Sequence, residues 1–395
     1  MTPSRDARVQ PMPRHASHEG RPGAIEIAIA PVWTIRYRGS ARQFDFVLVA
    51  LLQAIGETGR LTEAARRAGI SYRHAWNVIE RWGAFFRSPL VLMTRGRGTR
   101  LTPLGEKLLW AAQRVDARLT PQLESLSSEL ARALNDGITG AAPPLRLHAS
   151  HDFAVAQLRE RLNQDGATRI DLQYRGSIDA LAALCHGACD VAGFHIADGP
   201  LQAEILGRYA KWMKPRSQRL IRFATRTQGF VVPPGNPKAI RTVADLARPG
   251  VRLINRQRGS GTRTLLEQLL AHAGLSGAAI AGFETEEYTH AAVAALVAGR
   301  LADVGFGVQA AADQFGLDFV PVATERYFLI LRTEMLEHAT VREMLGFLRG
   351  GEFRRLVASL PGYGADLAGE VLAIPAALPW RHLREPQREV AGSSP

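Results

Sequence analysis

The sequence predicts a chain of two folded parts joined by a long helix. The first is a small, mainly helical unit with a helix-turn-helix and a β-hairpin, and the second is a larger α/β unit of two lobes. Three observations lead to this fold class. Apolar residues recur at helical spacing on both sides of a glycine in residues 61–82, leucines recur at near-heptad spacing in residues 106–134, and strand-like and helix-like segments alternate after residue 145.

Residues 61–82, LTEAARRAGISYRHAWNVIERW, predict a helix, a tight turn and a second helix. Gly69 permits the turn because glycine adopts positive φ without steric cost, and Ser71 is a favourable N-cap. The second helix places its apolar residues on one face, which leaves polar donors on the other, and such a helix suits the major groove of DNA. The residues assigned to base recognition on this helix are Ser71, Tyr72, Arg73, His74, Asn77 and Arg81.

A basic hairpin is predicted directly after this motif. Residues 89–94 and 99–102 are typical of two short strands around a turn of alternating arginine and glycine. Arg95, Arg97 and Arg100 stand where a wing would meet phosphates. Residues 60–100 hold 9 arginines and 2 glutamates, so +7 of the chain's formal net charge of +12 lies in this segment. We therefore expect a winged helix-turn-helix that binds double-stranded DNA; the alternative is an ordinary helical hairpin with a solvated basic face.

The composition is that of a globular protein of 395 residues, with 46% hydrophobic and 22% charged residues. The pI near 10.4 favours polyanionic partners. Cys185 and Cys189 are too few for a disulfide framework, and their C-H-x-x-C pattern lacks further ligands for a metal site, so we expect no metal. No apolar run reaches membrane-spanning length and residues 1–20 lack a signal-peptide core, so we expect a cytoplasmic protein without a membrane partner.

Changes in composition suggest the domain boundaries. We expect a disordered basic tail over residues 1–24, the DNA-binding unit over 25–105 and a linker and dimerisation helix over 106–140. The α/β unit is expected over residues 145–375, followed by a flexible tail over 376–395. Residues 24–36 alternate in polarity and are expected to pair with the wing or to lie in a dimer interface.

The leucines of residues 106–134 recur at near-heptad spacing. This stripe predicts either a dimerisation seam or a face packed on a core, and Pro121 predicts either a kink or two helices in series. We expect the protein to be a homodimer or a homotetramer.

After residue 145 the pattern predicts parallel strands with helices between them. Two longer segments, residues 223–232 and 319–331, are expected to cross between two halves. Ligands of such folds bind outside the carboxyl ends of the strands, which predicts a cleft between the lobes. The shorter predicted strands are residues 145–149, 170–174, 190–194, 251–255 and 303–307.

Residues 255–263, NRQRGSGTR, predict an anion site at one of these strand ends. Glycines let backbone N–H groups approach an anion, hydroxyls add donors, and a helix N-terminus favours negative charge. The spacing is not that of a Walker motif, and a capped strand-to-helix turn without ligand would look the same. The residues assigned to the effector in this loop are Arg256, Arg258, Gly259, Ser260, Gly261 and Thr262.

Other strand ends carry hydroxyls and imidazoles that we expect at the same edge of the sheet. Tyr327 is expected to line the cleft or to tie the lobes together, and a glutamate of residues 284–287 is expected either to pair with Arg258 or to meet the ligand. No nucleophile with a base and an orienting group is recognisable, so we expect neither an enzyme nor a covalent cofactor. The remaining effector assignments are Ser150, His151, Ser177, His195 and Thr289.

Residues 44–110 resemble the N-terminal DNA-binding domain of the molybdate-responsive ModE regulators, which is akin to that of LysR-type regulators. The motifs that carry the resemblance are LLQAIGETGRLTEAARRAGISYRHAWNVIERW, PLV and LTPLG. Residues 145–360 instead resemble the type II periplasmic-binding-protein-like domain found on some molybdopterin biosynthesis proteins, through NRQRGSGTRTLL, THAAV, ADVGFG and ERY.

These resemblances imply a ligand-responsive transcription factor that binds operator DNA and controls genes for molybdenum enzymes or their cofactor. The implied effector is a small anion, either molybdate or tungstate, or the molybdenum cofactor itself. Three alternatives remain: a LysR-like regulator of a small carboxylate such as formate, a molybdopterin enzyme or carrier tethered to DNA, and an architectural DNA-binding protein.

Overall fold

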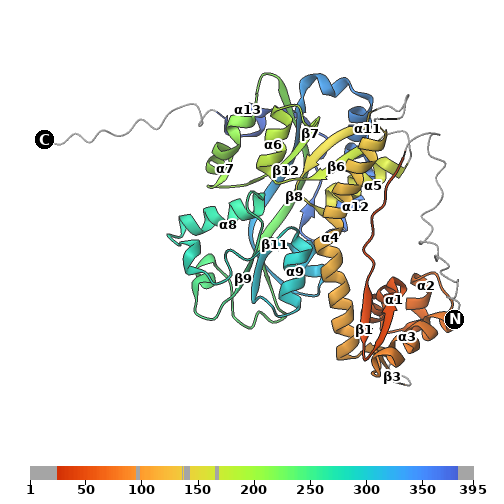
Figure 1. The fold of residues 1–395 in the computed structure, drawn as a ribbon. Helices are drawn as coiled ribbons and strands as arrows, with labels where there is room; N and C mark the ends of the chain where they lie inside the picture. The colour runs from red at the N-terminus through yellow and green to blue at the C-terminus, as the bar shows by residue number, and fades with distance from the viewer. Residues whose placement is uncertain (1–24, 95–97, 136, 138–142, 165–168, 381–395) are drawn as a thin grey trace.

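The structure is a computed structural model and describes residues 25–94, 98–135, 137, 143–164 and 169–380. It confirms the predicted fold class, with a winged helix-turn-helix, a long helix and a two-lobed α/β unit (Figure 1). The expectations for residues 1–24, for Arg95 and Arg97 of the wing and for most of the linker at 136–144 lie outside the described residues. In the described ranges no helix is long and apolar enough to cross a membrane.

The N-terminal unit packs three helices around one core. Helix α1 begins after Asp45, whose carboxylate accepts from the Val47 N–H, and ends at Gly59 in the left-handed region. Gly69 has φ of 65° in the turn before α3, and the Ser71 hydroxyl caps α3, as predicted. Trp82 is fully buried at the centre of this core. The elements are β1 Thr34–Tyr37, β2 Ser40–Gln43, α1 Phe46–Thr58, α2 Leu61–Arg67, α3 Tyr72–Phe86, β3 Val91–Thr94 and β4 Gly98–Leu101.

Residues 24–36 were expected to pair with the wing or to lie in a dimer interface, and the pairing with the wing is not found. Strand β1 pairs with β2, which directly follows it in the chain, whereas in the described residues the wing strands β3 and β4 pair with each other. The sequence pattern identified the strand but not its partner, because a tight turn at Arg38 and Gly39, both with positive φ, forms a local hairpin instead.

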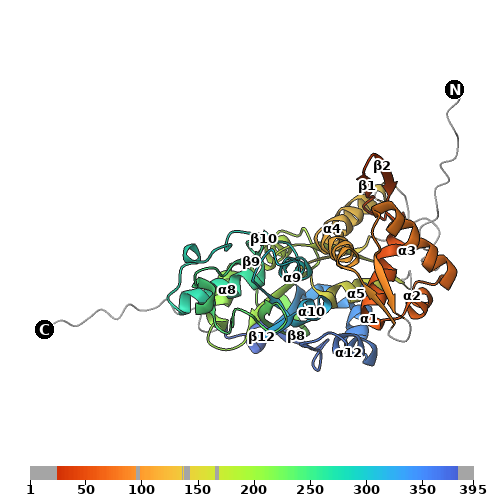
Figure 2. The same ribbon diagram turned by 90° about the horizontal axis from the view of Figure 1, so that it is seen from below.

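Helix α4 (Pro103–Asn135) is one continuous helix that includes Pro121. Residues 25–33 run beside it in an extended conformation, and Asn135 holds their start through two hydrogen bonds with the backbone of Ile25. Figure 2 shows α4 between the winged unit and the α/β unit.

The α/β unit is built on one ten-stranded sheet with the order β10-β9-β11-β8-β12-β7-β5-β6 and two short strands beside β8. Strands β5, β6 and β7 are parallel, as are β9, β10 and β11. The two long central strands, β8 and β12, are antiparallel, so the prediction of parallel sheets holds only on either side of them. The strands are β5 Leu145–Ala149, β6 Ile170–Tyr174, β7 Val191–Ala197, β8 Gln218–Val232, β9 Leu253–Arg256, β10 Glu286–Glu287, β11 Val304–Val308, β12 Asp318–Arg332, β13 Tyr363–Gly364 and β14 Val371–Ala373.

Strands β8 and β12 join the two lobes. Residues 228–231 of β8 pair with β11, whereas residues 325–331 of β12 pair with β7. The first lobe therefore contains β5, β6 and β7, and the second contains β9, β10 and β11 (Figure 1). The helices are α5 Phe153–Gln164, α6 Ser177–Cys185, α7 Gln202–Tyr209, α8 Gly261–His272, α9 His290–Ala298, α10 Gln309–Gln314, α11 Ala339–Arg349, α12 Gly351–Ala358 and α13 Ile374–Ala377.

Residues 376–380, where the expected flexible tail would begin, are packed, and the rest of that expectation, residues 381–395, lies outside the described residues. Leu378 is 4% exposed and belongs to the largest apolar core, with Trp380 packed against it. Leucine and tryptophan at 378 and 380 supply the apolar surface that packs residues 376–380 against this core.

Candidate DNA-binding face and ligand site

Helix α3 presents a polar, solvent-exposed face. Tyr72, Arg73, His74 and Asn77 are exposed, whereas Ala75, Val78, Ile79 and Trp82 are buried against α1 and α2. The side chains of Arg73 and Asn77 have no hydrogen-bond or ion-pair partner in the described part of the chain. The outer face of α3 is therefore chemically free to contact another molecule, whereas Ser71 at its start uses its hydroxyl to cap the His74 N–H.

Arg81 differs from the other arginines of this face. Its guanidinium forms an ion pair of 2.9 Å with Asp45, the N-cap of α1. This pair links α3 to the start of α1, so Arg81 orients the helix rather than standing free. Sequence periodicity placed Arg81 on the outer face correctly but could not predict the carboxylate from a helix 36 residues earlier.

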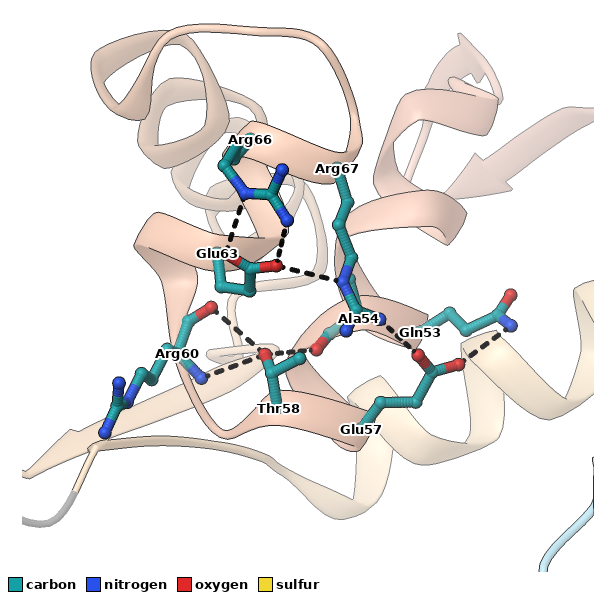
Figure 3. A network of polar contacts seen from close by, with 8 residues as sticks. All are labelled: Gln53, Ala54, Glu57, Thr58, Arg60, Glu63, Arg66 and Arg67. Atoms are coloured by element: carbon teal, nitrogen blue, oxygen red, sulfur yellow. Dashed lines mark hydrogen bonds and ion pairs between the residues drawn. The ribbon is translucent and has the colours of Figure 1, made fainter.

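The exposed arginines of α2 are also paired, in a network that links α2 to α1. Arg66 forms two hydrogen bonds with Glu63, and Arg67 contacts both Glu63 and Glu57 (Figure 3). The hydrogen bond from Arg66 lowers the pKa of Glu63 to about 2, so this carboxylate stays ionised. The charge of α2 is therefore largely compensated, in contrast to Arg73 on α3.

The wing is anchored at its base. The Thr99 N–H donates to the carbonyl of Gly59 at 2.8 Å, and the Thr102 hydroxyl accepts from the Gly105 N–H at the start of α4. Arg100 is exposed on β4, next to the turn. The base of the wing is therefore held by the end of α1 and by the first turn of α4.

Side chains from both lobes meet in a buried polar group that we call the interlobe cluster. Its centre is Arg226 on β8, which pairs with Asp152 at 2.6 Å and with Glu325 at 3.0 Å. Gln228 donates to Glu325 and to Thr262, at 2.8 and 2.9 Å. All members are at most 2% exposed except Ser150, at 6%. The cluster comprises Ser150, Asp152, Ser177, His195, Arg226, Gln228, Arg256, Thr262, His290, Glu325 and Tyr327.

Arg256 adds a second cation to the cluster, and among the described residues Asp152 and Glu325 stabilise it only from beyond ion-pair distance. Its side chain donates to Gln257 and to the carbonyl of Tyr288, and it forms no ion pair among the described residues. Burial, and then the charge of Arg226, lower the pKa of Arg256 to about 9. A buried cation without a counter-ion is costly, so this position favours an anion.

Neutral donors and imidazoles surround these charges. Neither ring nitrogen of His195 has a hydrogen-bond partner in the described residues, and the same holds for Nδ1 of His290 and the hydroxyls of Ser150 and Tyr327. The His195 and Tyr327 rings lie 3.8 Å apart. Burial lowers the pKa of His195 and of His290 well below the ordinary value, so both imidazoles are neutral at pH 7. The polar atoms are thus buried without the partners that such atoms normally have.

The glycine-containing loop at residues 259–262 brings the lobes together. A Cβ on Gly176 of the first lobe would lie 2.6 Å from the Gly259 carbonyl of the second. A Cβ on Gly261 would lie 3.4 Å from the Ser177 hydroxyl, which is itself fully buried. The N-terminus of α8 therefore faces Ser177 and His195, while Ser260 caps α8 by accepting from the Arg263 N–H.

Two effector assignments, Arg258 and Thr289, differ from the sequence expectation. Arg258 lies at the surface and pairs with Glu284 at 2.7 Å, because two neighbouring glutamates there compensate its charge. Thr289 directs its hydroxyl away from the cluster, to the Ala117 carbonyl of α4. The His151 ring packs against Tyr174, and its buried Nδ1, like that of His290, has no hydrogen-bond partner among the described residues.

Sequence reasoning missed the centre of the cluster. Arg226, Gln228 and Glu325 lie in the two strands that were assigned only a crossing role. Charged residues inside otherwise apolar strands, in FATRTQGF and ATERYFLIL, were the signal that could have identified them.

The described residues contain no group of three or more metal-ligating side chains placed to hold an ion. Cys189 is buried and its thiol contacts the carbonyl of Ala180, while Cys185 is half-buried.

This architecture defines a class of protein in which a helix-turn-helix unit is joined to a two-lobed ligand-binding fold. Residues 46–106 match the family described as bacterial regulatory helix-turn-helix protein, lysR family, and residues 158–349 match the PBP superfamily domain. The chain therefore combines a LysR-type helix-turn-helix with a PBP superfamily domain.

Three proteins are similar to parts of this chain. The uncharacterized protein YvgK of Bacillus subtilis is 32% identical over 51% of this chain and 64% of its own length. The molybdenum-pterin-binding protein MopB of Rhodobacter capsulatus is 38% identical over 21% of this chain and 32% of its own length. The molybdenum transport protein ModE of Herbaspirillum seropedicae is 44% identical over 17% of this chain and 26% of its own length. The chain thus spans less than two thirds of each of these relatives.

Proposed function

We propose that this protein is a transcriptional regulator that binds operator DNA through α3 and the wing and responds to a small oxyanion bound at the interlobe cluster. The observation that carries the proposal is the joint occurrence, in one chain, of an exposed polar α3 face and a buried cluster with unpartnered donors. Two copies are proposed to act together, as a dimer or a higher oligomer, on a two-part operator.

The DNA contacts follow from the pairing of the arginines. Arg73 and Asn77 are free to reach base edges, with Tyr72 and His74 beside them, because the arginines of α2 and Arg81 are held by carboxylates. Arg100 and the other wing arginines are assigned to phosphate contacts.

The proposed effector class follows from the donors of the cluster. Ser150, Ser177, His195, His290 and Tyr327 supply neutral donors, and Arg256 supplies a positive charge. A tetrahedral oxyanion offers four oxygens to this set, whereas formate offers two. The almost complete burial of these side chains favours a small anion over the larger molybdenum cofactor.

Molybdate and tungstate are the specific candidates. Two of the relatives are named for molybdenum, one as a pterin-binding and one as a transport protein. We propose that such an anion controls genes that serve molybdenum metabolism, with formate as the alternative effector.

Titration calorimetry on the full-length protein with molybdate, tungstate, sulfate and formate tests the effector. We expect saturable binding of molybdate or tungstate that is lost when His195→Ala and Tyr327→Phe are combined, and kept in the control Arg258→Ala, whose side chain lies outside the cluster. An affinity for molybdate that is equal in the cluster variant and the wild type would refute this site. Tighter binding of formate would select the alternative effector.

Selection of binding sites from random double-stranded DNA tests the regulator. We expect one enriched motif with two half-sites. Recovery of DNA without any motif would favour an architectural role, and turnover of a pterin by the full-length protein would favour the tethered enzyme.

A further inference from the structure

Helix α4 contacts the three parts of the molecule in order along its length. Its first turns pack on the winged unit, where Leu104, Leu108 and Leu109 contact the core of the helix-turn-helix. Its middle lies against α9 of the second lobe, and its last turns lie against β6 of the first lobe (Figure 1). One continuous helix therefore touches both lobes and the DNA-binding unit.

The contact with the second lobe is specific and close. The indole of Trp110 donates to the Ala295 carbonyl at 2.7 Å, and a Cβ on Gly299 would lie 2.5 Å from the indole ring. Ala117 packs with Ala291 and Ala292 in the first turn of α9. Residues 110–118 of α4 are thus fitted to α9.

The polar contacts with the first lobe lie after Pro121, whereas Phe153 at the start of α5 already packs against the cluster of Ala117, Ala291 and Ala292. The Tyr174 N–H at the end of β6 donates to the Ser125 hydroxyl at 3.1 Å, and the Tyr174 hydroxyl donates to Glu124. Arg132 pairs with Asp171 on β6 at 2.9 Å. Pro121 therefore lies between the polar contacts of α4 with the second lobe and its polar contacts with the first.

Pro121 also leaves a carbonyl of α4 without its partner in the helix, and the second lobe supplies the missing donor. A residue at position 121 would normally donate its N–H to the carbonyl of Ala117, but proline has no N–H. Ala117 is 9% exposed, so its carbonyl requires another donor. The hydroxyl of Thr289 supplies it at 2.7 Å, while the same hydroxyl accepts from the Ala292 N–H and caps α9.

Thr289 is the residue directly before a member of the interlobe cluster. His290 lies 3.5 Å from the guanidinium of Arg226, which pairs with Asp152 of the first lobe. The start of α9 therefore contacts the ligand site through His290 and the linker helix through Thr289. A shift of the second lobe relative to the first must move one of these contacts or bend α4 at Pro121.

We propose that α4 is an intramolecular brace across the two lobes, and that the hydrogen bond from Thr289 to the Ala117 carbonyl transmits lobe position to the winged unit. When the lobes are closed, α4 is seated on both, and the orientation of the winged unit is fixed. When they separate, the Thr289 contact is lost, and α4 bends at Pro121. The response of this brace to a bound anion rests on the proposed function, whereas the contact of α4 with both lobes does not.

Hydrogen–deuterium exchange on the unliganded full-length protein tests the structural part. Thr289→Val preserves the shape of the side chain and removes the donor, so amide exchange in residues 113–125 should rise about tenfold, the equivalent of one buried hydrogen bond. Thr289→Ser retains the hydroxyl and should leave this exchange unchanged. The first turn of α9 will also loosen in the valine variant because its cap is lost.

Pro121→Ala provides the decisive control. It supplies an N–H to the Ala117 carbonyl, so Thr289→Val should then no longer accelerate exchange in α4, although the first turn of α9 still loosens. An equal rise of α4 exchange in both backgrounds, or no rise in either, would overturn the proposal. If the valine variant does not fold, Gly299→Ala disrupts the contact between α4 and α9 instead, because the added methyl group would displace the Trp110 ring. The same rise in the amide exchange of α4 is expected.

The transmission is tested with sodium molybdate as the probe. In Thr289→Val, molybdate should bind within about threefold of its wild-type affinity but should no longer change the affinity for the selected DNA. A retained DNA response would overturn the transmission role. Failure of the wild type to bind molybdate would refute the proposed effector, while the exchange experiment would still decide whether α4 is a brace.

Discussion

Nη1 of Arg226 lies 2.6 Å from Oδ2 of Asp152, and both side chains are almost completely buried where the two lobes meet. The hydroxyl of Tyr363 donates to the same carboxylate oxygen at 2.8 Å. Three segments that are far apart in the chain are thus held at one point. Removal of one partner from a buried ion pair is far more destabilising than removal of a surface partner, because the remaining charge stays buried.

Asp152→Asn is therefore expected to destabilise the α/β unit by about 3 kcal/mol. Asp198→Asn is the matched control, since Asp198 pairs with Arg326 at the surface and should cost less than about 1 kcal/mol. Urea unfolding followed by far-ultraviolet circular dichroism measures both. Equal midpoints for the two variants would contradict a structural role for the buried pair.

The recognition helix makes a second prediction. Arg73→Ala or Asn77→Ala should each lower affinity for the selected DNA by about tenfold to a hundredfold, because a well-made base contact contributes about 1–3 kcal/mol. The melting temperature should not change, since both side chains are exposed and unpaired in the described residues.

Arg66→Ala is the control for this helix. Arg66 is an exposed arginine on the neighbouring helix α2, and it is held by Glu63 (Figure 3). Its removal should leave the base preference unchanged. Loss of the selected motif in Arg66→Ala, with retention in Arg73→Ala, would show that α2 and not α3 recognises the bases. Fluorescence anisotropy at fixed salt concentration measures these affinities.

Much of the winged unit was predictable because its signals are local. The turn at Gly69, the cap at Ser71 and the apolar face of α3 each depend on residues that are close together in the sequence. The rim of the interlobe cluster was expected at the strand ends, but its centre was not, because Arg226 meets Asp152 and Glu325 across 74 and 99 residues of chain. Periodicity assigns a residue to a face, but the partner of that face depends on how distant strands cross.

Helix α4 illustrates the same difference. Its leucine stripe predicted either a seam or a face packed on a core; Leu126, Leu130 and Leu134 are exposed, whereas Leu108 packs against the core of the winged unit. The side that packs on the lobes instead buries small residues, among them Ala117, together with Pro121, and it also carries Trp110, which contacts α9. A heptad pattern therefore described one face of α4 and gave no indication of the second.

The close approach of the lobes at Gly176 makes a third prediction. Gly176 has φ of −62°, which alanine also adopts, so Gly176→Ala changes only the space available next to the Gly259 carbonyl. The added methyl group should keep the lobes apart and weaken anion binding at least about tenfold, since overpacking costs roughly 1–3 kcal/mol. Gly346→Ala on α11, where a Cβ meets no atom within 4 Å, should bind as the wild type does. Calorimetry on both variants checks this, and unchanged binding in Gly176→Ala would show that the lobes need not touch there.

The buried histidines make a fourth prediction, on pH. Burial lowers the pKa of His148 and of His151 to about 4, and that of His195 and His290 well below the ordinary value near 6.5. Between pH 6.5 and 4 the unfolded chain binds protons that the folded chain does not, so the free energy of unfolding decreases as the pH falls through this window. Each histidine contributes a slope of up to about 1.4 kcal/mol per pH unit.

Urea unfolding between pH 7.5 and 4.5 measures this slope. His148→Gln should make it shallower, whereas His272→Gln, which removes an exposed imidazole at the end of α8, should leave it unchanged. A stability that is constant from pH 7.5 to 4.5 would mean that the buried imidazoles take up protons in the folded protein.

The exposed leucines of α4 make the last prediction, on self-association. Leu126, Leu130 and Leu134 are 43%, 41% and 52% exposed, and their spacing of four residues places them on one side of the helix. Two copies that pack these faces together would remove them from water, at about 25 cal/mol for each Å² buried. Leu130→Glu places a charge in the middle of that face and should weaken the dimer at least about tenfold. Leu92→Glu, at a leucine of the wing that is 55% exposed, is the matched control and should leave the dimer intact. Analytical ultracentrifugation over a range of protein concentrations distinguishes the two outcomes, and a dimer of undiminished stability in Leu130→Glu would place the interface on another surface.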